Sequence, residues 1–227
     1  MREKLIYLFS LVAVSLIAWD LYRIFMVLPD EINQGAIYRI IYFHVPAAIT
    51  AMSGFFVAMV MSALYLITRN LKFDSVAAAV TEVSVVFAAV NLVTGSIWAR
   101  VIWGIWWTWD ARLTSMLICW LLYAGYLMLR RATDEPTQRA RLSGVLSIFA
   151  FVDVIIVWKS IEWWRTQHPA PVLSIRQGGG MAPGMESPLW WNVLAMGLVA
   201  VSLVLLRMRQ EGIRRELDAL RRYAHAL

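Results

Sequence analysis

Residues 76–97 read VAAAVTEVSVVFAAVNLVTGSI, an apolar run interrupted by a single charged side chain, that of Glu82. A helix of about 20 such residues spans the hydrocarbon core of a lipid bilayer. Within that core only helices and closed barrels satisfy their own backbone hydrogen bonds. Runs of the same character occupy residues 5–28, 46–67, 113–129, 142–158 and 189–206. The sequence therefore predicts an all-α integral membrane bundle of six transmembrane helices.

The overall composition also favours a membrane protein. Of the 227 residues, 60% are hydrophobic and 16% are charged, whereas soluble domains are about 45–50% apolar and about 25% charged. The net charge of +6 does not indicate nucleic acid, because Lys and Arg stand at the ends of apolar runs. The single cysteine, Cys119, excludes an internal disulfide and a CxxC haem-attachment motif.

The distribution of Lys and Arg predicts how the chain crosses the membrane. Six spans place both termini and the connections 68–75 and 130–141 on one side, and these segments hold 14 of the 21 basic residues. The positive-inside rule makes that side, with both termini, cytoplasmic, in a multi-pass protein of the cell's inner (cytoplasmic) membrane. We divide the chain into a membrane domain, residues 1–206, and a basic amphipathic tail, residues 207–227. The tail is expected to rest on anionic membrane lipid, and docking onto a cytoplasmic partner is the alternative.

Tryptophan is concentrated on the opposite, outer side, which receives the loops 29–45, 98–112 and 159–188. A belt of interfacial aromatic residues would occupy both membrane surfaces. The one-sided cluster instead predicts an outer-face apolar platform for a flat, hydrophobic partner. Within the second loop we expect Gly104 to permit close approach of another group. Eleven of the 12 tryptophans belong to this outer half: Trp19, Trp98, Trp103, Trp106, Trp107, Trp109, Trp158, Trp163, Trp164, Trp190 and Trp191.

Two of the three histidines also belong to the outer side. His44 stands shortly before Pro46, and His168 directly precedes Pro169. Both prolines suit the fixed end of a segment better than the interior of a helix. An isolated loop histidine is usually only a solvated side chain. Two neutral imidazoles on one aromatic face, however, could coordinate one metal ion, and haem iron commonly takes axial histidine.

Haem would also bring two propionate groups, for which arginine is the better bidentate partner. Among the outer-side cations we favour Arg39 and Arg112, because each is close in sequence to His44 or to the tryptophan loop. Asp110 is predicted to be the N-cap of the fourth helix and can orient Arg112 at the same time.

Three polar side chains fall inside predicted spans: those of Glu82, Asn91 and Asp153. Such groups are costly in a membrane and normally face the interior of the bundle. We expect helix–helix hydrogen bonds or partner contacts from them, and a proton or ion pathway is the alternative.

These residues carry a resemblance to a known family. The chain resembles the cytochrome c maturation protein C family, also called haem exporter protein C or CcmC, a group of haem-handling proteins with a tryptophan-rich motif. The resemblance lies in residues 38–48 (YRIIYFHVPAA), 92–96 (LVTGS), 103–115 (WGIWWTWDARLTS) and 162–168 (EWWRTQH). These segments extend over most of residues 38–168, and the six-span layout agrees for the rest.

The resemblance implies that the protein holds haem b as cargo at the outer face and presents it to a periplasmic haem chaperone during c-type cytochrome biogenesis. It implies a small single-span membrane subunit and ABC transporter subunits as further partners. We expect no enzymatic activity, since the chemistry belongs mostly to haem and its acceptor. His44 and His168 match the axial ligands, and Trp106–Asp110 matches the platform at the haem edge. We expect haem to lie edge-on against Trp103, Trp106, Trp107 and Trp109, with its propionates neutralised by Arg39 and Arg112.

Two alternatives belong to other classes of protein. A membrane redox enzyme of the cytochrome b type normally needs histidines within its spans, and no predicted span contains one. A multi-span small-molecule or ion transporter would show repeat symmetry, broken helices and polar residues that converge at mid-membrane. Those features are weakly represented in this sequence.

Overall fold

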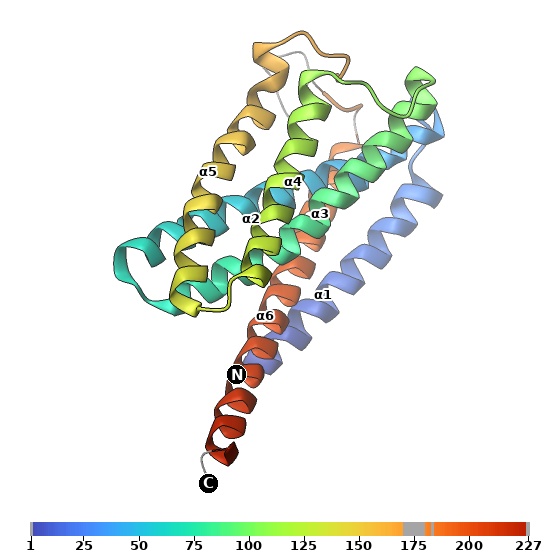
Figure 1. Cartoon of the computed structure of the whole chain (residues 1–227). Coiled ribbons are helices and arrows are strands. Elements are labelled where there is room, and N and C mark those ends of the chain that lie inside the picture. The colour runs from blue at the N-terminus through green and yellow to red at the C-terminus, as the bar shows by residue number, and fades with distance from the viewer. Residues whose placement is uncertain (1, 170–179, 183, 226–227) are drawn as a thin grey trace.

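The protein is described by a computed structural model that covers residues 2–169, 180–182 and 184–225. Six of its helices are long and apolar enough to cross a membrane, which confirms the predicted all-α bundle (Figure 1). A π-helical turn, Arg23–Val27, follows α1, and a 3-10 turn, Ala36–Ile40, precedes α2. The described residues contain no strand beyond an isolated bridge between Glu31 and Gly35. The helices are α1 (Arg2–Tyr22), α2 (Ile41–Thr68), α3 (Leu71–Trp103), α4 (Ala111–Ala132), α5 (Pro136–Trp163) and α6 (Glu186–His225).

Helices α2 to α5 form the central bundle, α6 packs against α2 and α3, and α1 packs along α6 (Figure 1). The core of the bundle is apolar, and its centre is a stacked pair of rings. Phe55 of α2 lies parallel to Tyr123 of α4, with ring centroids 3.8 Å apart. Cys119 is fully buried in the same cluster. Stacked aromatic rings contribute specific geometry as well as buried area, so this pair fixes how α2 and α4 meet.

The helices are longer than the apolar runs that predicted them, because polar residues at both ends join the helical backbone. The side chain of Asn70 caps α3 by accepting a hydrogen bond from the Lys72 N–H at 3.0 Å. The predicted cap of α4 is confirmed, since Asp110 Oδ1 accepts from the Leu113 N–H at 2.9 Å. At Gly104 no atom of the described residues would lie within 4 Å of an added Cβ. The glycine ends α3, where its φ is +76°, in the left-handed region that favours glycine.

The start of the second span was also placed wrongly. Helix α2 begins at Ile41, so both His44 and Pro46 lie inside it. A proline within a membrane helix removes one backbone hydrogen bond, and packing against neighbouring helices compensates for that loss. Here Pro46 is buried in the second turn, where the helix has only begun to form its hydrogen-bond ladder.

The bundle has two distinct ends. The two termini lie at one end (Figure 1), where Arg209 of α6 pairs with Glu3 of α1 at 2.6 Å; we call this the terminus end. The opposite end carries the connections 104–110 and 164–169, and we call it the tryptophan end. Helix α6 continues to His225, so the predicted boundary at residues 206 and 207 falls within one helix. The side chains of residues 214–225 lie outside the described part of the chain, and the amphipathic tail stays a prediction.

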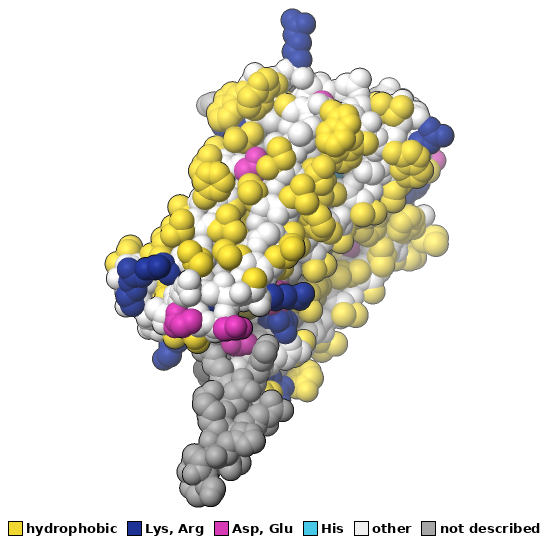
Figure 2. Space-filling model, in the orientation of Figure 1, with side chains coloured by type: hydrophobic (Ala, Val, Ile, Leu, Met, Phe, Trp, Pro, Cys, Tyr) yellow, Lys and Arg dark blue, Asp and Glu magenta, His cyan; other side chains and the backbone are white. Residues whose placement is uncertain are grey.

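Hydrophobic side chains cover the flank of the bundle between its two ends, and Lys and Arg side chains stand near the ends (Figure 2). Helix α1 shows this most clearly, because its large apolar side chains, including Tyr7, Leu11 and Val14, are exposed. Contiguous exposed apolar surface of this extent is unusual for a soluble monomer and suits contact with lipid.

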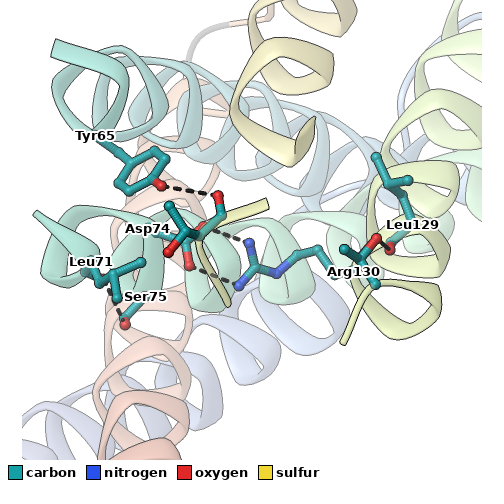
Figure 3. A network of polar contacts seen from close by, with 8 residues as sticks. Tyr65, Leu71, Asp74, Ser75, Leu129 and Arg130 are labelled. Atoms are coloured by element: carbon teal, nitrogen blue, oxygen red, sulfur yellow. Dashed lines mark hydrogen bonds and ion pairs between the residues drawn. The ribbon is translucent and has the colours of Figure 1, made fainter. Parts of the chain in front are cut away.

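A polar network joins the helices at the terminus end (Figure 3). The Arg130 guanidinium of α4 donates two hydrogen bonds to the Asp74 carboxylate of α3, at 2.5 and 3.0 Å. The Tyr65 hydroxyl of α2 donates to the backbone carbonyl of Thr137 in α5 at 3.2 Å. Bidentate arginine–carboxylate pairs are geometrically specific, so the first contact fixes the register of α3 against α4.

Replacing Asp74 by Asn should destabilise the protein, because the Arg130 guanidinium loses its charged partner. The side chains of Arg130 and Asp74 are only 15% and 7% exposed, so we expect a loss of about 2 kcal/mol, typical of a hydrogen bond to a charged group. The measurement is the thermal unfolding midpoint in mild detergent. Arg131→Gln, at the exposed neighbouring position, is the matched control and should leave the midpoint unchanged. Equal midpoints for Asp74→Asn and the parent would contradict the structural role of the pair.

Candidate functional site

A cavity of about 300 Å³ opens at the tryptophan end among α2, α3, α4, α5 and the segment after α5. Its walls are mostly apolar, and Arg112 is the one charged side chain among the described residues that line it. A small-molecule site is commonly an apolar hollow of roughly 300–1,000 Å³ with a few polar groups, and this cavity lies at the lower end of that range. The lining includes Gln34, His44, Met52, Asn91, Gly95, Trp98, Ile102, Trp103, Trp107, Arg112, Met116, Val157, Trp158, Ile161, Gln167, His168 and Pro169.

The imidazole of His44 is held by α3 in one orientation. The Thr94 hydroxyl donates to the backbone carbonyl of Val90 at 2.7 Å, so its oxygen is left to accept from the Nδ1–H of His44 at 3.0 Å. A neutral imidazole has only one N–H, and the partner of one ring nitrogen therefore decides what the other can do. In His44 this puts the lone pair on Nε2. The Asn91 amide nitrogen lies 3.3 Å from that atom and 3.2 Å from Nδ1, so a ligand at Nε2 has to replace the Asn91 contact.

Three further residues of α3 shape the same pocket. The Asn91 amide donates to the backbone carbonyl of His44 at 3.1 Å, which is the kind of helix–helix hydrogen bond expected of it. Gly95 lies directly against the ring, since a Cβ built there would come within 2.9 Å of Cε1 of His44. Trp98 meets the imidazole edge-on, with centroids 5.8 Å apart, and its Nε1 donates to Gln34 at 2.8 Å.

His168 reaches the cavity from the segment that follows α5. Its Nδ1 lies 2.9 Å from the carbonyl oxygen of Pro169. A carbonyl can only accept, so Nδ1 carries the proton and Nε2 carries the lone pair. The two histidines predicted as a pair thus line one cavity, and in both the lone pair is on Nε2.

Asp110 does not line the cavity, and the structure gives it a different position. Besides capping α4, its carboxylate accepts from the Thr166 hydroxyl at 2.7 Å and from the Gln167 N–H at 3.2 Å. Thr166 in turn accepts from the His168 N–H at 3.1 Å. Asp110 therefore connects the tryptophan loop to the segment that carries His168.

The four predicted platform tryptophans divide into two pairs. Trp103 and Trp107 line the cavity. Trp106 and Trp109 do not line it, and they are 60% and 77% exposed. Trp107 and Trp109 still touch edge-on, with centroids 5.9 Å apart, so the loop presents one aromatic surface inward and another outward.

Two lining tryptophans, Trp98 and Trp158, were not predicted to belong to the site. For Trp98 a signal was present in the sequence. Asn91, Gly95, Trp98 and Ile102 recur at intervals of three and four residues, which places them on one face of a helix. Trp158 has no such pattern around it, because α5 carries small and apolar side chains on several faces.

The two predicted arginines also differ in position. Arg112 lines the cavity, and its Nη1 donates to the backbone carbonyl of Val157. Arg39 does not line it. Its guanidinium donates to the carbonyls of Ile24 at 2.8 Å and Leu28 at 3.0 Å, and it pairs with Asp30. Arg39 therefore holds the turn after α1 against the start of α2.

The remaining polar residues inside spans lie away from the cavity. Glu82 pairs with Arg207 of α6, a helix–helix contact of the expected kind. Asp153 is buried in α5, and its Oδ2 has no hydrogen-bond partner in the described part of the chain. Neither residue contributes to the lining of the cavity.

Replacing Gly95 by Ala should push the His44 imidazole out of place. The added methyl group would approach Cε1 to 2.9 Å, and Thr94 and Asn91 prevent the ring from swinging aside. Overpacking of this kind typically costs about 1–3 kcal/mol, which we expect as a lower thermal unfolding midpoint. Gly125→Ala is the control, because nothing lies within 4 Å of that position. If both variants unfold at the same temperature as the parent, the tight contact is not a constraint.

His168 should stay neutral at mildly acidic pH. Burial is the main cause, and the Arg112 guanidinium adds to it; together they lower the pKa of His168 from 6.5 to about 4. Between those two values the unfolded chain binds a proton that the folded protein does not, so His168 reduces stability as pH falls from 6.5 towards 4. The check is an imidazole NMR titration in detergent, with His168→Gln to assign the signal. A folded-state midpoint near 6.5 would contradict the placement of His168 in the cavity beside Arg112.

The family model described as "Heme exporter protein C" matches residues 1–223. Curated proteins named Heme exporter protein C are similar over most of their length. The one from Escherichia coli K12 is 40% identical over 80% of this chain and 73% of its own, and the one from Bradyrhizobium diazoefficiens is 38% identical over 91% and 78%. The one from Paracoccus denitrificans is 37% identical over 85% and 80%. The chain is a multi-pass membrane protein that belongs to the haem exporter protein C family.

Proposed function

We propose that the protein binds haem in the cavity at the tryptophan end and presents it to an acceptor during c-type cytochrome biogenesis. The observation that carries this proposal is the pair of histidines, His44 and His168, which line one apolar cavity with the lone pair of each ring on Nε2. Neutral imidazole nitrogen is the usual axial ligand of haem iron. The two side chains come from α2 and from the segment after α5, so they approach from different elements.

The other lining groups suit the rest of a haem molecule. Trp103 and Trp107 offer flat apolar surface to the macrocycle, and the guanidinium of Arg112 suits a propionate. The indole Nε1 of Trp107 is buried without a hydrogen-bond partner in the described part of the chain, so it is available to a bound ligand. Haem is larger than the cavity, and one edge would therefore stay outside, beside the exposed Trp106 and Trp109.

We further propose that the tryptophan end faces the periplasm. The positive-inside rule puts both termini in the cytoplasm, so the cavity opens on the outer face of the inner membrane. The relatives' name, Heme exporter protein C, agrees with haem as the cargo, and we propose that this cargo is haem b, held transiently. The proposed partners are a periplasmic haem chaperone at the exposed loop surface, a small single-span membrane subunit, ABC transporter subunits and membrane lipid. No enzymatic step is assigned to the chain.

The test is an absorption spectrum of the detergent-purified protein after production with excess haem. The parent should show a low-spin Soret band typical of two nitrogen ligands. His44→Ala and His168→Ala should each lose it or shift it, because each removes one axial ligand. His225→Ala alters the third histidine, far along α6 from the cavity, and is the matched control that should keep the parent spectrum.

Two results would count against this proposal. Identical haem content and spectra in all four proteins would show that His44 and His168 are not the axial ligands, and other residues would then have to be tested as ligands. A parent protein that carries no haem, even beside a haem chaperone, would favour the alternative of a small-molecule or ion transporter.

A further inference from the structure

The two histidines of the cavity are held in different ways. His44 lies within α2, and the helix α3 beside it supplies the groups that contact it, including Thr94, Asn91 and Gly95. His168 lies beyond the last residue of α5, in a segment without helical hydrogen bonds. Its backbone is fixed to the rest of the protein by side-chain contacts instead.

Those contacts converge on one small side chain. The hydroxyl of Thr166 donates to Oδ2 of Asp110 at 2.7 Å, and the same oxygen accepts the His168 N–H at 3.1 Å. Thr166 is therefore both donor and acceptor in a chain that runs from a carboxylate to the backbone of His168. Hydrogen bonds to an ionised carboxylate are shorter and stronger than those between neutral groups. The contact between Thr166 and Asp110 is therefore the stronger of the two.

Asp110 performs its two tasks with different oxygens. Oδ1 accepts from the Leu113 N–H and caps α4, whereas Oδ2 accepts from Thr166 and from the Gln167 N–H. The cap and the attachment of the His168 segment can therefore be separated by substitution. A change at Thr166 leaves the cap intact and acts only on the attachment.

We propose that Thr166 is a positioning residue. Its hydroxyl links the Asp110 carboxylate to the backbone of His168, and this link determines the fraction of bound haem whose iron has His168 as a ligand. His44 is held independently, by α3. This inference rests on the proposed function, because it concerns the same pair of ligands. It adds a residue that touches neither iron nor the cavity wall but sets the occupancy of one ligand.

The experiment compares Thr166→Val with Thr166→Ser in haem-loaded protein. Valine is close to threonine in shape but has no hydroxyl, and serine keeps the hydroxyl. In Thr166→Val the ratio of six-coordinate low-spin haem to five-coordinate haem should fall roughly tenfold, as for the loss of one hydrogen bond to a charged group. Thr166→Ser should keep the parent ratio. Added imidazole should restore the low-spin spectrum of Thr166→Val and of His168→Ala, because it replaces the missing ligand.

Two outcomes of the spectra would overturn the inference. One is a Thr166→Val spectrum equal to that of the parent. The other is a Thr166→Val protein that loses haem altogether and does not respond to imidazole, because the effect would then not be confined to the His168 ligand.

A second measurement needs no haem and so separates this inference from the proposed function. Arg165 is exposed and directly precedes Thr166, so trypsin cleavage after Arg165 reports how firmly the segment is held. In haem-free protein, Thr166→Val should be cleaved roughly tenfold faster than Thr166→Ser, for the same lost hydrogen bond. Equal cleavage rates would overturn the positioning role. A parent protein without haem would instead refute the proposed function, and the cleavage rates would still decide what Thr166 does.

Discussion

A neutral imidazole carries one N–H and one lone pair, so the hydrogen-bond partner of one ring nitrogen decides what the other nitrogen can do. The two histidines of the cavity at the tryptophan end obey this constraint. Nδ1–H of His44 donates to the Thr94 hydroxyl, and Nδ1–H of His168 donates to the Pro169 carbonyl. In both cases the proton is on Nδ1 and the lone pair is on Nε2, and in His44 the Asn91 amide nitrogen lies 3.3 Å from Nε2. The hydrogen bonds that the surrounding carbonyl and hydroxyl groups accept from Nδ1 thus determine which nitrogen of each histidine can bind a ligand.

The helices could be predicted from the sequence because a membrane helix needs only a long apolar run and no distant contacts. Their ends could be predicted less well. Where a short polar side chain precedes a helix, as Asp110 does, the cap was predictable, since that rule is local. The start of α2 was not, because a proline reads locally as the edge of a helix. Packing of Pro46 among its neighbours extends that helix past His44.

The cavity shows the same division between local and tertiary information. The residue types that line it, histidine, tryptophan and arginine, could be predicted from their unusual clustering. The sequence could not predict which of the clustered residues face the cavity. Trp106 and Trp107 are adjacent in the chain yet lie on opposite surfaces of the loop, one exposed and one lining the cavity. Arg39 was a reasonable partner for a propionate by sequence, but the turn after α1 presents carbonyls that occupy its donors.

The loop 104–110 therefore belongs to two surfaces at once. Its inward side includes Trp107, its outward side includes Trp109, and the two rings touch. At its end Asp110 caps α4 and holds the His168 segment. A substitution within this loop can therefore alter more than one of three features: the outward surface, the cavity wall and the placement of His168. A defect produced by such a change cannot by itself distinguish a lost partner contact from a lost ligand. Thr166 lies outside the loop and touches only the last of these three, so a variant at that position isolates the placement of His168 from the other two.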